Sequence, residues 1–270
     1  MKRLLFATFA CLLPALAQQG APAQPPRTAQ ALAPIDVTGT WVSLIVDEWR
    51  FRVSPVKGDI LYMPLNAEAR RIANAWDPDK DEAAGQACKA YGAVGVMQRP
   101  GRIRIGWADA NTLRLEADAG TQTRTLHFGA TPPGAPSWQG NSLAGWQGVG
   151  GVLLDLGGIG FVPGLVANAA GGAGAGAGRR GAAAPKGGAL KVVTTNMLPG
   201  YLRKNGVPYS DKAVLTEYFN VVTGQQNDQY LVVTAFVEDP TYLTQPFIRT
   251  YTFKKQADAS GWQPTPCLPR

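Results

Sequence analysis

The stretch Val214–Val222 (VLTEYFNVV) carries the alternation that decides the fold class. In an extended strand successive side chains point to opposite faces, so Glu217 shares a face with Leu215 and Phe219. An apolar face opposite a more polar one is typical of a strand with one buried side. The stretch therefore predicts a β-strand that directs one acidic side chain toward the core.

Similar short segments, separated by Gly, Pro, Asn and Asp, recur along the chain from Gly39 onward. Helical composition is confined to Asn66–Trp76, where Asn66 is suited to cap the helix. Many strands with a single short helix predict an all-β protein, a sandwich or a barrel, and we expect an antiparallel barrel. The predicted strands are Thr40–Val53, Ile60–Pro64, Arg102–Trp107, Thr112–Asp118, Thr121–Phe128, Ser142–Gln147, Leu190–Asn196, Val214–Val222, Tyr230–Glu238 and Phe247–Lys254.

The N-terminal region predicts export. Residues 1–17 begin with Lys2 and Arg3, continue as a short apolar run and end in a small-x-small sequence, which is typical of a secretory signal peptide. Residues 18–38 are rich in Pro, Ala and Gln, so we expect a flexible leader. A single β-barrel domain is predicted for 39–267, in a periplasmic or secreted protein.

A long insertion at 148–189 interrupts this domain between two predicted neighbouring strands. Its second half is a low-complexity segment rich in Gly and Ala, and its first half is apolar but also rich in Gly. Asp155 and Pro163 in the apolar half argue against a transmembrane span, so membrane contact is not expected. A loop that covers a cavity, a surface that binds a partner and an expansion without function all stay open.

Two cysteines, Cys88 and Cys267, remain once the predicted signal peptide is removed. In an oxidising compartment two thiols most simply form one disulfide, which would tie the chain end to an early loop. Two unpaired buried thiols and a catalytic Cys–His pair are the alternatives. The sequence has no CxxC pair or other metal-ligand spacing, and we predict neither a metal nor a cofactor.

The formal net charge of +7 comes from scattered Lys and Arg residues, not from a basic stripe interleaved with aromatic residues. This pattern disfavours nucleic-acid binding and fits surface charge that aids solubility. The expected partner is a small molecule, and the composition leaves the oligomeric state open.

Three charged side chains fall on strand faces that are otherwise apolar. Besides Glu217, Arg249 alternates with aromatic residues in Phe247–Lys254, and Arg124 falls on the apolar face of Thr121–Phe128 (TQTRTLHF). A buried charge is costly unless it is paired, so the pattern predicts an interior Glu–Arg cluster. Such a cluster could orient the polar group of a ligand in an apolar cavity, or it could be a structural salt bridge.

His127 is the only histidine, and alternation places it among threonines, outside the barrel or at its rim. A histidine among threonines needs no special chemistry, but the strand ends in a loop, so acid–base work stays open. The alternative function is therefore a cofactor-independent lyase, isomerase or hydrolase acting on a small secreted or scavenged compound. Its candidate catalytic residues are His127, Glu217, Asp118 and Asp239.

Several motifs follow one another in a fixed order. Gly39-Thr-Trp41 opens the first predicted strand and is similar to the entry signature of lipocalin-type barrels. Between about Thr121 and Phe253, after Arg124 and His127, the series reads Trp138-Gln-Gly140-Asn-Ser142-Leu-Ala144-Gly-Trp146, Leu190-Lys-Val-Val-Thr194, Gly206-Val-Pro208-Tyr-Ser210, Thr216-Glu217-Tyr-Phe219 and Asp239-Pro240-Thr-Tyr242-Leu-Thr244-Gln-Pro246.

This series resembles a family of exported, β-rich proteins of soil bacteria, with the pattern W-x-G-x-S-x-A-x-W, T-E-x-F and D-P-x-x-[FY]-T-x-P. The chain departs from it in three places: the family's His-Pro turn reads His127-Phe-Gly, the insertion separates Trp146 from Leu190, and Leu243 takes an aromatic position. The resemblance implies an exported lipocalin-like domain with a cysteine near each end of its core, and it implies no activity.

The leading hypothesis is a barrel that holds a small, largely apolar ligand, with aromatic side chains supplying contact area and charged ones orienting a polar group. A module that binds a partner through its apolar insertion is a further alternative. The residues expected to line the ligand site are Arg124, Trp138, Trp146, Tyr201, Tyr209, Glu217, Phe219, Arg249 and Tyr251.

Overall fold

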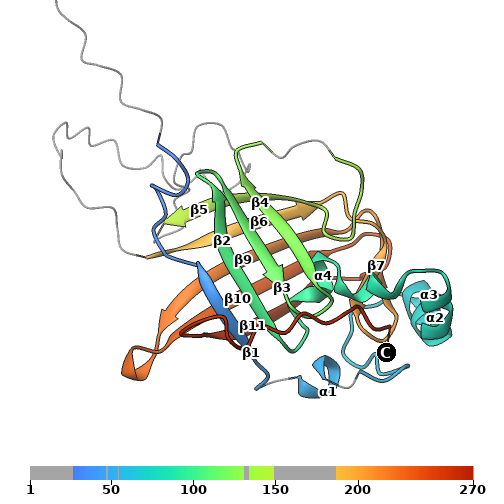
Figure 1. Cartoon of the computed structure of the whole chain (residues 1–270). Helices are drawn as coiled ribbons and strands as arrows, with labels where there is room; N and C mark the ends of the chain where they lie inside the picture. The colour runs from blue at the N-terminus through green and yellow to red at the C-terminus, as the bar shows by residue number, and fades with distance from the viewer. Residues whose placement is uncertain (1–26, 47, 54, 131–133, 149–186, 270) are drawn as a thin grey trace, which may run out of the picture.

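The computed structural model describes residues 27–46, 48–53, 55–130, 134–148 and 187–269. Within these residues nine strands close into a barrel, in the spatial order β1-β11-β10-β9-β6-β5-β4-β3-β2 (Figure 1). The prediction of a β-barrel is therefore confirmed. The barrel strands are β1 (Gly39–Leu44), β2 (Arg102–Asp109), β3 (Thr112–Ala117), β4 (Gln122–Phe128), β5 (Asn141–Gly148), β6 (Gly188–Thr195), β9 (Val214–Thr223), β10 (Gln229–Glu238) and β11 (Phe247–Lys255), and β7 (Gly200–Arg203) pairs with β8 (Val207–Tyr209) in a separate two-stranded sheet.

The barrel sheet is mixed, so the expectation of a purely antiparallel barrel was wrong. β4 and β5 run parallel, with Leu126 opposite Ser142, whereas the other barrel pairs are antiparallel. The reason is the connection that follows Phe128, because it returns the chain to the opposite end of the barrel before β5 begins. Parallel neighbours require a long crossover of this kind.

Several short helices lie between β1 and β2, where the sequence predicted one. The predicted helix is confirmed as α2 (Ala67–Ala75), and Asn66 Oδ1 accepts a hydrogen bond from Ala69 N at 2.9 Å, as an N-cap does. The additional helices are α1 (Trp49–Arg52), α3 (Pro78–Ala83), α4 (Ala93–Val96) and the 3-10 helix η1 (Ala87–Tyr91), and a second 3-10 helix, η2 (Gln225–Asn227), lies between β9 and β10.

Two of the predicted strands differ from the structure. The first ends at Leu44 instead of Val53, because Glu48 adopts a left-handed backbone conformation (φ 51°) and the chain turns into α1. Ile60–Pro64 forms a turn in which Tyr62 has φ 61°. A positive φ is incompatible with an extended strand, and the alternation of residue types does not report it.

Side chains from the inward strand faces fill the barrel interior. Trp41 and Phe219 are fully buried, and Phe253 is almost so. In β4 Arg124 is buried, whereas His127 is half-buried on the opposite face among threonines, as the alternation predicted. The interior is thus a packed core of apolar side chains that contains a few charged ones.

Residues 27–38, the described part of the predicted leader 18–38, cover one end of the barrel. Ala29 is fully buried, and its N–H donates to Asn111 Oδ1 at 2.8 Å. Its carbonyl accepts a hydrogen bond from Trp146 Nε1, also at 2.8 Å. The segment then runs directly into β1 (Figure 1). The composition of this segment, rich in Pro, Ala and Gln, does not indicate that Ala29 docks on the barrel.

The helices between β1 and β2 and the β7–β8 pair gather at the other end of the barrel (Figure 1). Val94 of α4 and Met97 just after it are buried in the core, and the Gln98 side chain donates to the carbonyl of Leu202 in β7. At this end, Arg52 lies 5.5 Å from the Tyr251 ring centroid and Glu48 pairs with Arg249, so residues between β1 and β2 contact β11.

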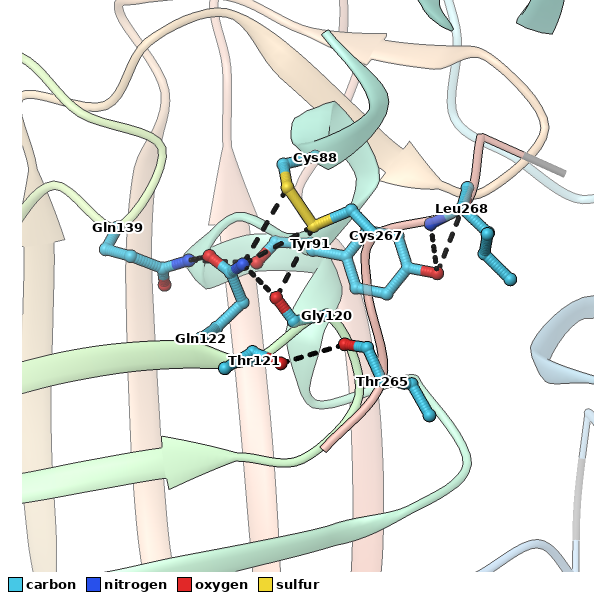
Figure 2. The surroundings of a disulfide bond; sticks show 9 residues. All are labelled: Cys88, Tyr91, Gly120, Thr121, Gln122, Gln139, Thr265, Cys267 and Leu268. Carbon is cyan, nitrogen blue, oxygen red and sulfur yellow. Dashed lines mark hydrogen bonds between the residues drawn. A yellow bond between two sulfur atoms is a disulfide. The ribbon is translucent and has the colours of Figure 1, made fainter. Parts of the chain in front are cut away.

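Cys88 and Cys267 form a disulfide, which confirms the predicted pairing (Figure 2). The bond joins η1 to the C-terminal segment across a sequence separation of 179 residues. Around it, Thr121 Oγ1 donates to the carbonyl of Thr265 at 2.9 Å, and Tyr91 Oη donates to the carbonyl of Leu268 at 3.3 Å. The C-terminal segment is therefore held against the barrel by covalent and polar contacts.

The predicted signal peptide, 1–17, lies outside the described residues, and so does most of the predicted insertion. The described flanks of that insertion, Gly148 in β5 and Gly188 in β6, are paired in antiparallel register. The chain thus leaves and re-enters the barrel through neighbouring strands, at the end covered by residues 27–38.

Candidate functional site

Arg124 and Glu217 meet inside the barrel, so two of the three charges predicted to point inward form a pair. Arg124 Nη2 lies 2.6 Å from Glu217 Oε2, Arg124 Nη1 donates to Oε1 at 3.2 Å, and each side chain is only 1% exposed. Arg124 Nη2 also donates to Thr194 Oγ1 at 3.2 Å, and that hydroxyl lies 2.8 Å from Ser142 Oγ. This polar network joins four strands: β4, β9, β6 and β5.

Arg249 does not join that pair. Its Nε lies 2.9 Å from Oε2 of Glu48, a residue from the segment before α1, and its side chain is partly exposed. The three predicted charges therefore do not form one cluster. Arg124 and Glu217 form a buried pair, and Arg249 belongs to a separate group of charges at the barrel end near α1.

The aromatic residues predicted to line the ligand site occupy different places. Phe219 and Tyr251 are buried in the barrel core. Trp138 donates from Nε1 to the carbonyl of Pro199 at 3.2 Å, and Tyr201 Oη donates to Asp81 Oδ2 at 2.7 Å, both beside the β7–β8 pair. The predicted set is therefore divided between the barrel core and the surroundings of the β7–β8 pair.

Tyr209 is also buried, and its hydroxyl is packed beside Gly92 and Gly200. Burial raises its pKa above the usual range, so the phenol stays neutral. In the part of the chain that the structure describes, this hydroxyl has no hydrogen-bond partner.

The four acid–base candidates each have a separate structural environment. His127 lies on the outer face, with Nε2 3.2 Å from Thr125 Oγ1. Asp118 Oδ1 accepts the N–H of Arg102 at 2.7 Å. Asp239 accepts three hydrogen bonds, from the N–H and hydroxyl of Ser210 and the N–H of Thr241, and Glu217 is paired as described above. Among the described residues, no hydrogen bond or ion pair links any two of the four.

A pocket of about 310 Å³ opens at the barrel end that residues 27–38 cover. Trp107 and Trp146 supply its aromatic wall, with ring centroids 6.4 Å apart, and the Phe128 ring packs against them at 5.7 and 5.2 Å. Offset aromatic rings at such distances form a stable apolar surface. We call this cavity the Trp107 pocket; it is lined by Gln30, Ala33, Pro34, Ile35, Asp36, Val37, Thr38, Trp107 and Trp146.

The polar groups of the Trp107 pocket lie on its outer wall. Asp36 Oδ1 accepts hydrogen bonds from the N–H and hydroxyl of Thr38, at 2.9 and 2.6 Å, which fixes the carboxylate at the rim. Gln30 is exposed beside it. The pocket thus combines an aromatic wall with a few polar groups at its opening, the composition expected of a small-molecule site.

Sequence reasoning named Trp146 as a ligand-site residue and missed the rest of this pocket. Trp107 carried a usable signal, because it continues the inward-facing alternation of Ile103 and Ile105. Residues 30–38 carried no such signal in the sequence. They line the pocket only because their segment docks on strands that are distant in the sequence.

A second, shallower pocket of about 510 Å³ lies outside the barrel, near α1 and α2. Its walls are largely polar or solvent-exposed, with Arg50, Asp59 and Arg70 among them. Arg50 Nε lies 2.7 Å from Asp59 Oδ2, so the charges here are partly matched.

Comparison with protein-family models, with curated proteins and with solved structures gives no match. None of the helices that the structure describes is long and apolar enough to cross a membrane. The functional argument therefore depends on the geometry of the chain itself.

Proposed function

We propose that the protein is an exported, lipocalin-like barrel that binds a small, largely apolar ligand in the Trp107 pocket. The observation that carries the proposal is the pair of indoles, Trp107 and Trp146, that line a pocket beneath residues 30–38 and are backed by Phe128. Aromatic surface in a concave site gains free energy when an apolar ligand displaces water from it.

The pocket volume of about 310 Å³ sets the size of the ligand. It lies at the lower end of the range for small-molecule sites, so a ligand of one or two rings is the best match. The ligand would lie against the indole of Trp107, with any polar substituent directed toward Gln30 and Thr38 at the opening.

Export is supported by the N-terminal sequence and by the Cys88–Cys267 disulfide, because disulfides persist in oxidising compartments. The lipocalin-like assignment is supported by the closed barrel and by Gly39-Thr-Trp41, whose tryptophan is fully buried. The Arg124–Glu217 pair has a structural role in this proposal, since neither of the pockets described above includes it.

The test is calorimetric titration of the full chain with 1-naphthol, a two-ring probe of suitable size. Trp107→Leu removes the aromatic wall at a partly buried position, and we expect binding to weaken about tenfold or more. Trp49→Leu is the matched control, because Trp49 is 65% exposed on α1, at the other end of the barrel.

Equal affinity in the wild type and Trp107→Leu, with both folded by circular dichroism, would place the binding site elsewhere. In a separate experiment, mass spectrometry of small molecules that co-purify with the exported protein would identify the natural ligand. That compound should compete with 1-naphthol if the Trp107 pocket is the site.

A further inference from the structure

Three arginines from distant parts of the chain converge at the barrel end opposite the Trp107 pocket. Arg99 follows α4, Arg203 ends β7 and Arg249 lies on β11. Arg99 and Arg203 both interact electrostatically with Tyr251, and Arg203 interacts with Arg249. We call these three residues the arginine cluster.

The cluster is buried, and part of its hydrogen-bonding capacity is unused. Arg99 is 5% exposed and Arg203 is 1% exposed. Within the described residues, Arg99 Nε, Arg99 Nη2 and Arg203 Nη1 are buried without a hydrogen-bond partner. Buried charged donors without acceptors are costly, and they call for an acceptor such as a bound ion or ligand.

Among the residues that the structure describes, two acidic side chains lie near Arg203. Glu48 is the carboxylate that bridges it, with Oε1 3.3 Å from Arg203 Nη2 and Oε2 2.9 Å from Arg249 Nε. Asp59 lies within electrostatic range of Arg203 but is paired with Arg50. Among the described residues, Glu48 is thus shared by two guanidinium groups, and the buried Arg52 adds a further positive charge within electrostatic range of Arg99. Burial accordingly lowers the pKa of both Arg99 and Arg203 to about 10.

Aromatic rings hold two of the guanidinium groups in place. Arg203 lies over the Phe51 ring at 3.9 Å and over Phe247 at 5.7 Å, and Arg249 lies over Phe247 at 4.4 Å. A guanidinium stacked by its face on a ring keeps the N–H groups along its edge available for a planar anion. The rings therefore restrict the positions of the Arg203 and Arg249 guanidinium groups.

Glu48 shows what kind of group the cluster accepts. Its carboxylate divides its two oxygens between two guanidinium groups, and its side chain is 28% exposed, so this side of the cluster reaches solvent. Its left-handed backbone (φ 51°, ψ 23°) is a conformation that non-glycine residues rarely adopt. Glu48 accepts a hydrogen bond from Arg203 and forms an ion pair with Arg249, whereas Arg99 has no such carboxylate among the described residues.

We propose that the arginine cluster is a binding site for a small organic acid, whose carboxylate enters beside Glu48 and accepts the free donors of Arg99 and Arg203. A dicarboxylate could pair one carboxylate with Arg99 and the other with Arg203. The site lies at the opposite end of the barrel from the Trp107 pocket, and it is independent of the proposed apolar ligand.

The experiment measures thermal unfolding of the full chain at low ionic strength with succinate as the probe. Dimethyl succinate is the neutral control, and sodium phosphate at matched ionic strength tests for a non-selective anion site. We expect succinate, at about a hundred times its Kd, to raise Tm by about 5–10 °C, and dimethyl succinate and phosphate to raise it far less.

Two variants separate ligand binding from a structural role. Arg99→Met should leave Tm without succinate unchanged or raised, because it removes an unpaired buried charge, and should abolish most of the response to succinate. Glu48→Gln should strengthen succinate binding about tenfold, because the competing carboxylate is gone. Arg114→Gln, an exposed arginine on the outer face of β3, is the matched control and should respond as the wild type does.

Three outcomes would overturn the proposal. The first is no rise in Tm with succinate in the wild type. The second is an equal rise with phosphate, which would indicate an inorganic anion only. The third is a fall of several degrees in the Tm of ligand-free Arg99→Met, which would make Arg99 a structural residue.

Discussion

Arg124 and Glu217 form a doubly hydrogen-bonded ion pair that spans the barrel interior from β4 to β9, and each side chain is 1% exposed. A pair buried to this extent loses nearly all of its hydration, and the attraction between the partners offsets that loss only while both are present. We infer that the pair contributes little to the net free energy of folding. Its main effect is to favour the arrangement in which these two strand faces point inward.

Glu217→Leu should destabilise the protein strongly. The change leaves the Arg124 guanidinium buried without its partner, and we expect the free energy of unfolding to fall by about 3–5 kcal/mol. The double variant Arg124→Met/Glu217→Leu removes both charges and should recover most of that loss. Urea unfolding of the three proteins gives the comparison. A double variant no more stable than Glu217→Leu would contradict this account.

Removal of the Cys88–Cys267 disulfide should also lower stability. The bond closes a loop of 179 residues in sequence, and loss of such a crosslink costs about 2–5 kcal/mol. We expect Cys88→Ser/Cys267→Ser to unfold at a lower urea midpoint than the oxidised wild type. Dithiothreitol should bring the wild type to the same midpoint and leave the variant unchanged. An unaltered wild-type midpoint after verified reduction would show that the bond contributes nothing.

Alternation in the sequence predicted the inward faces of the barrel strands because that signal is local. Arg124 and Glu217 were placed inside by their neighbours two positions away, and both are inside. His127 was placed on the threonine face by the same rule, and it lies there. The rule needs only an extended backbone and one apolar face.

The charges at the barrel end could not be predicted in the same way. Arg249 was correctly assigned to the inner face of its strand, but its partner is Glu48, which comes from a loop far away in sequence. Arg99 and Arg203 lie outside regular barrel strands, in segments without a hydrophobic period. Their convergence depends on how α4 and β7 pack on the barrel, which is tertiary information that neither segment contains.

Tyr209→Phe should become more stabilising as pH rises above about 10. Burial raises the pKa of Tyr209 in the folded protein, while in the unfolded chain the phenol ionises near 10. The unfolded state therefore loses this proton first, and the contribution of Tyr209 to stability, fully present below pH 10, is lost at higher pH. Phenylalanine cannot ionise, so the variant does not lose stability at high pH through this position.

At pH 7 the same variant should be at least as stable as the wild type, because the Tyr209 hydroxyl has no hydrogen-bond partner among the described residues. Urea unfolding at pH 7.0 and pH 11.0 measures both effects. Tyr62→Phe is the control, since Tyr62 is 86% exposed and its replacement should have the same small effect at either pH. A stability difference between Tyr209→Phe and wild type that stays constant with pH would contradict the prediction.

Gly206→Ala should disrupt the turn between β7 and β8, the strand pair that carries Arg203. Gly206 has φ 81°, and an added Cβ would lie 2.1 Å from Trp76 Cγ and 2.2 Å from Trp76 Cβ. Both the left-handed backbone and the clash with a ring at the end of α2 oppose alanine, so we expect a loss of about 2–4 kcal/mol.

Gly85→Ala separates these two causes, because Gly85 has φ 67° and an added Cβ would meet no atom within 4 Å. That variant has only the backbone cost, about 1 kcal/mol. Chemical denaturation of both variants provides the stabilities, and the difference between them measures the packing of Trp76 on the β7–β8 turn. If Trp76 packs there as tightly as the structure has it, Gly206→Ala must also weaken the response to succinate, since displacement of β7 moves Arg203. Equal losses in the two variants would leave only backbone strain at Gly206, with no role for Trp76.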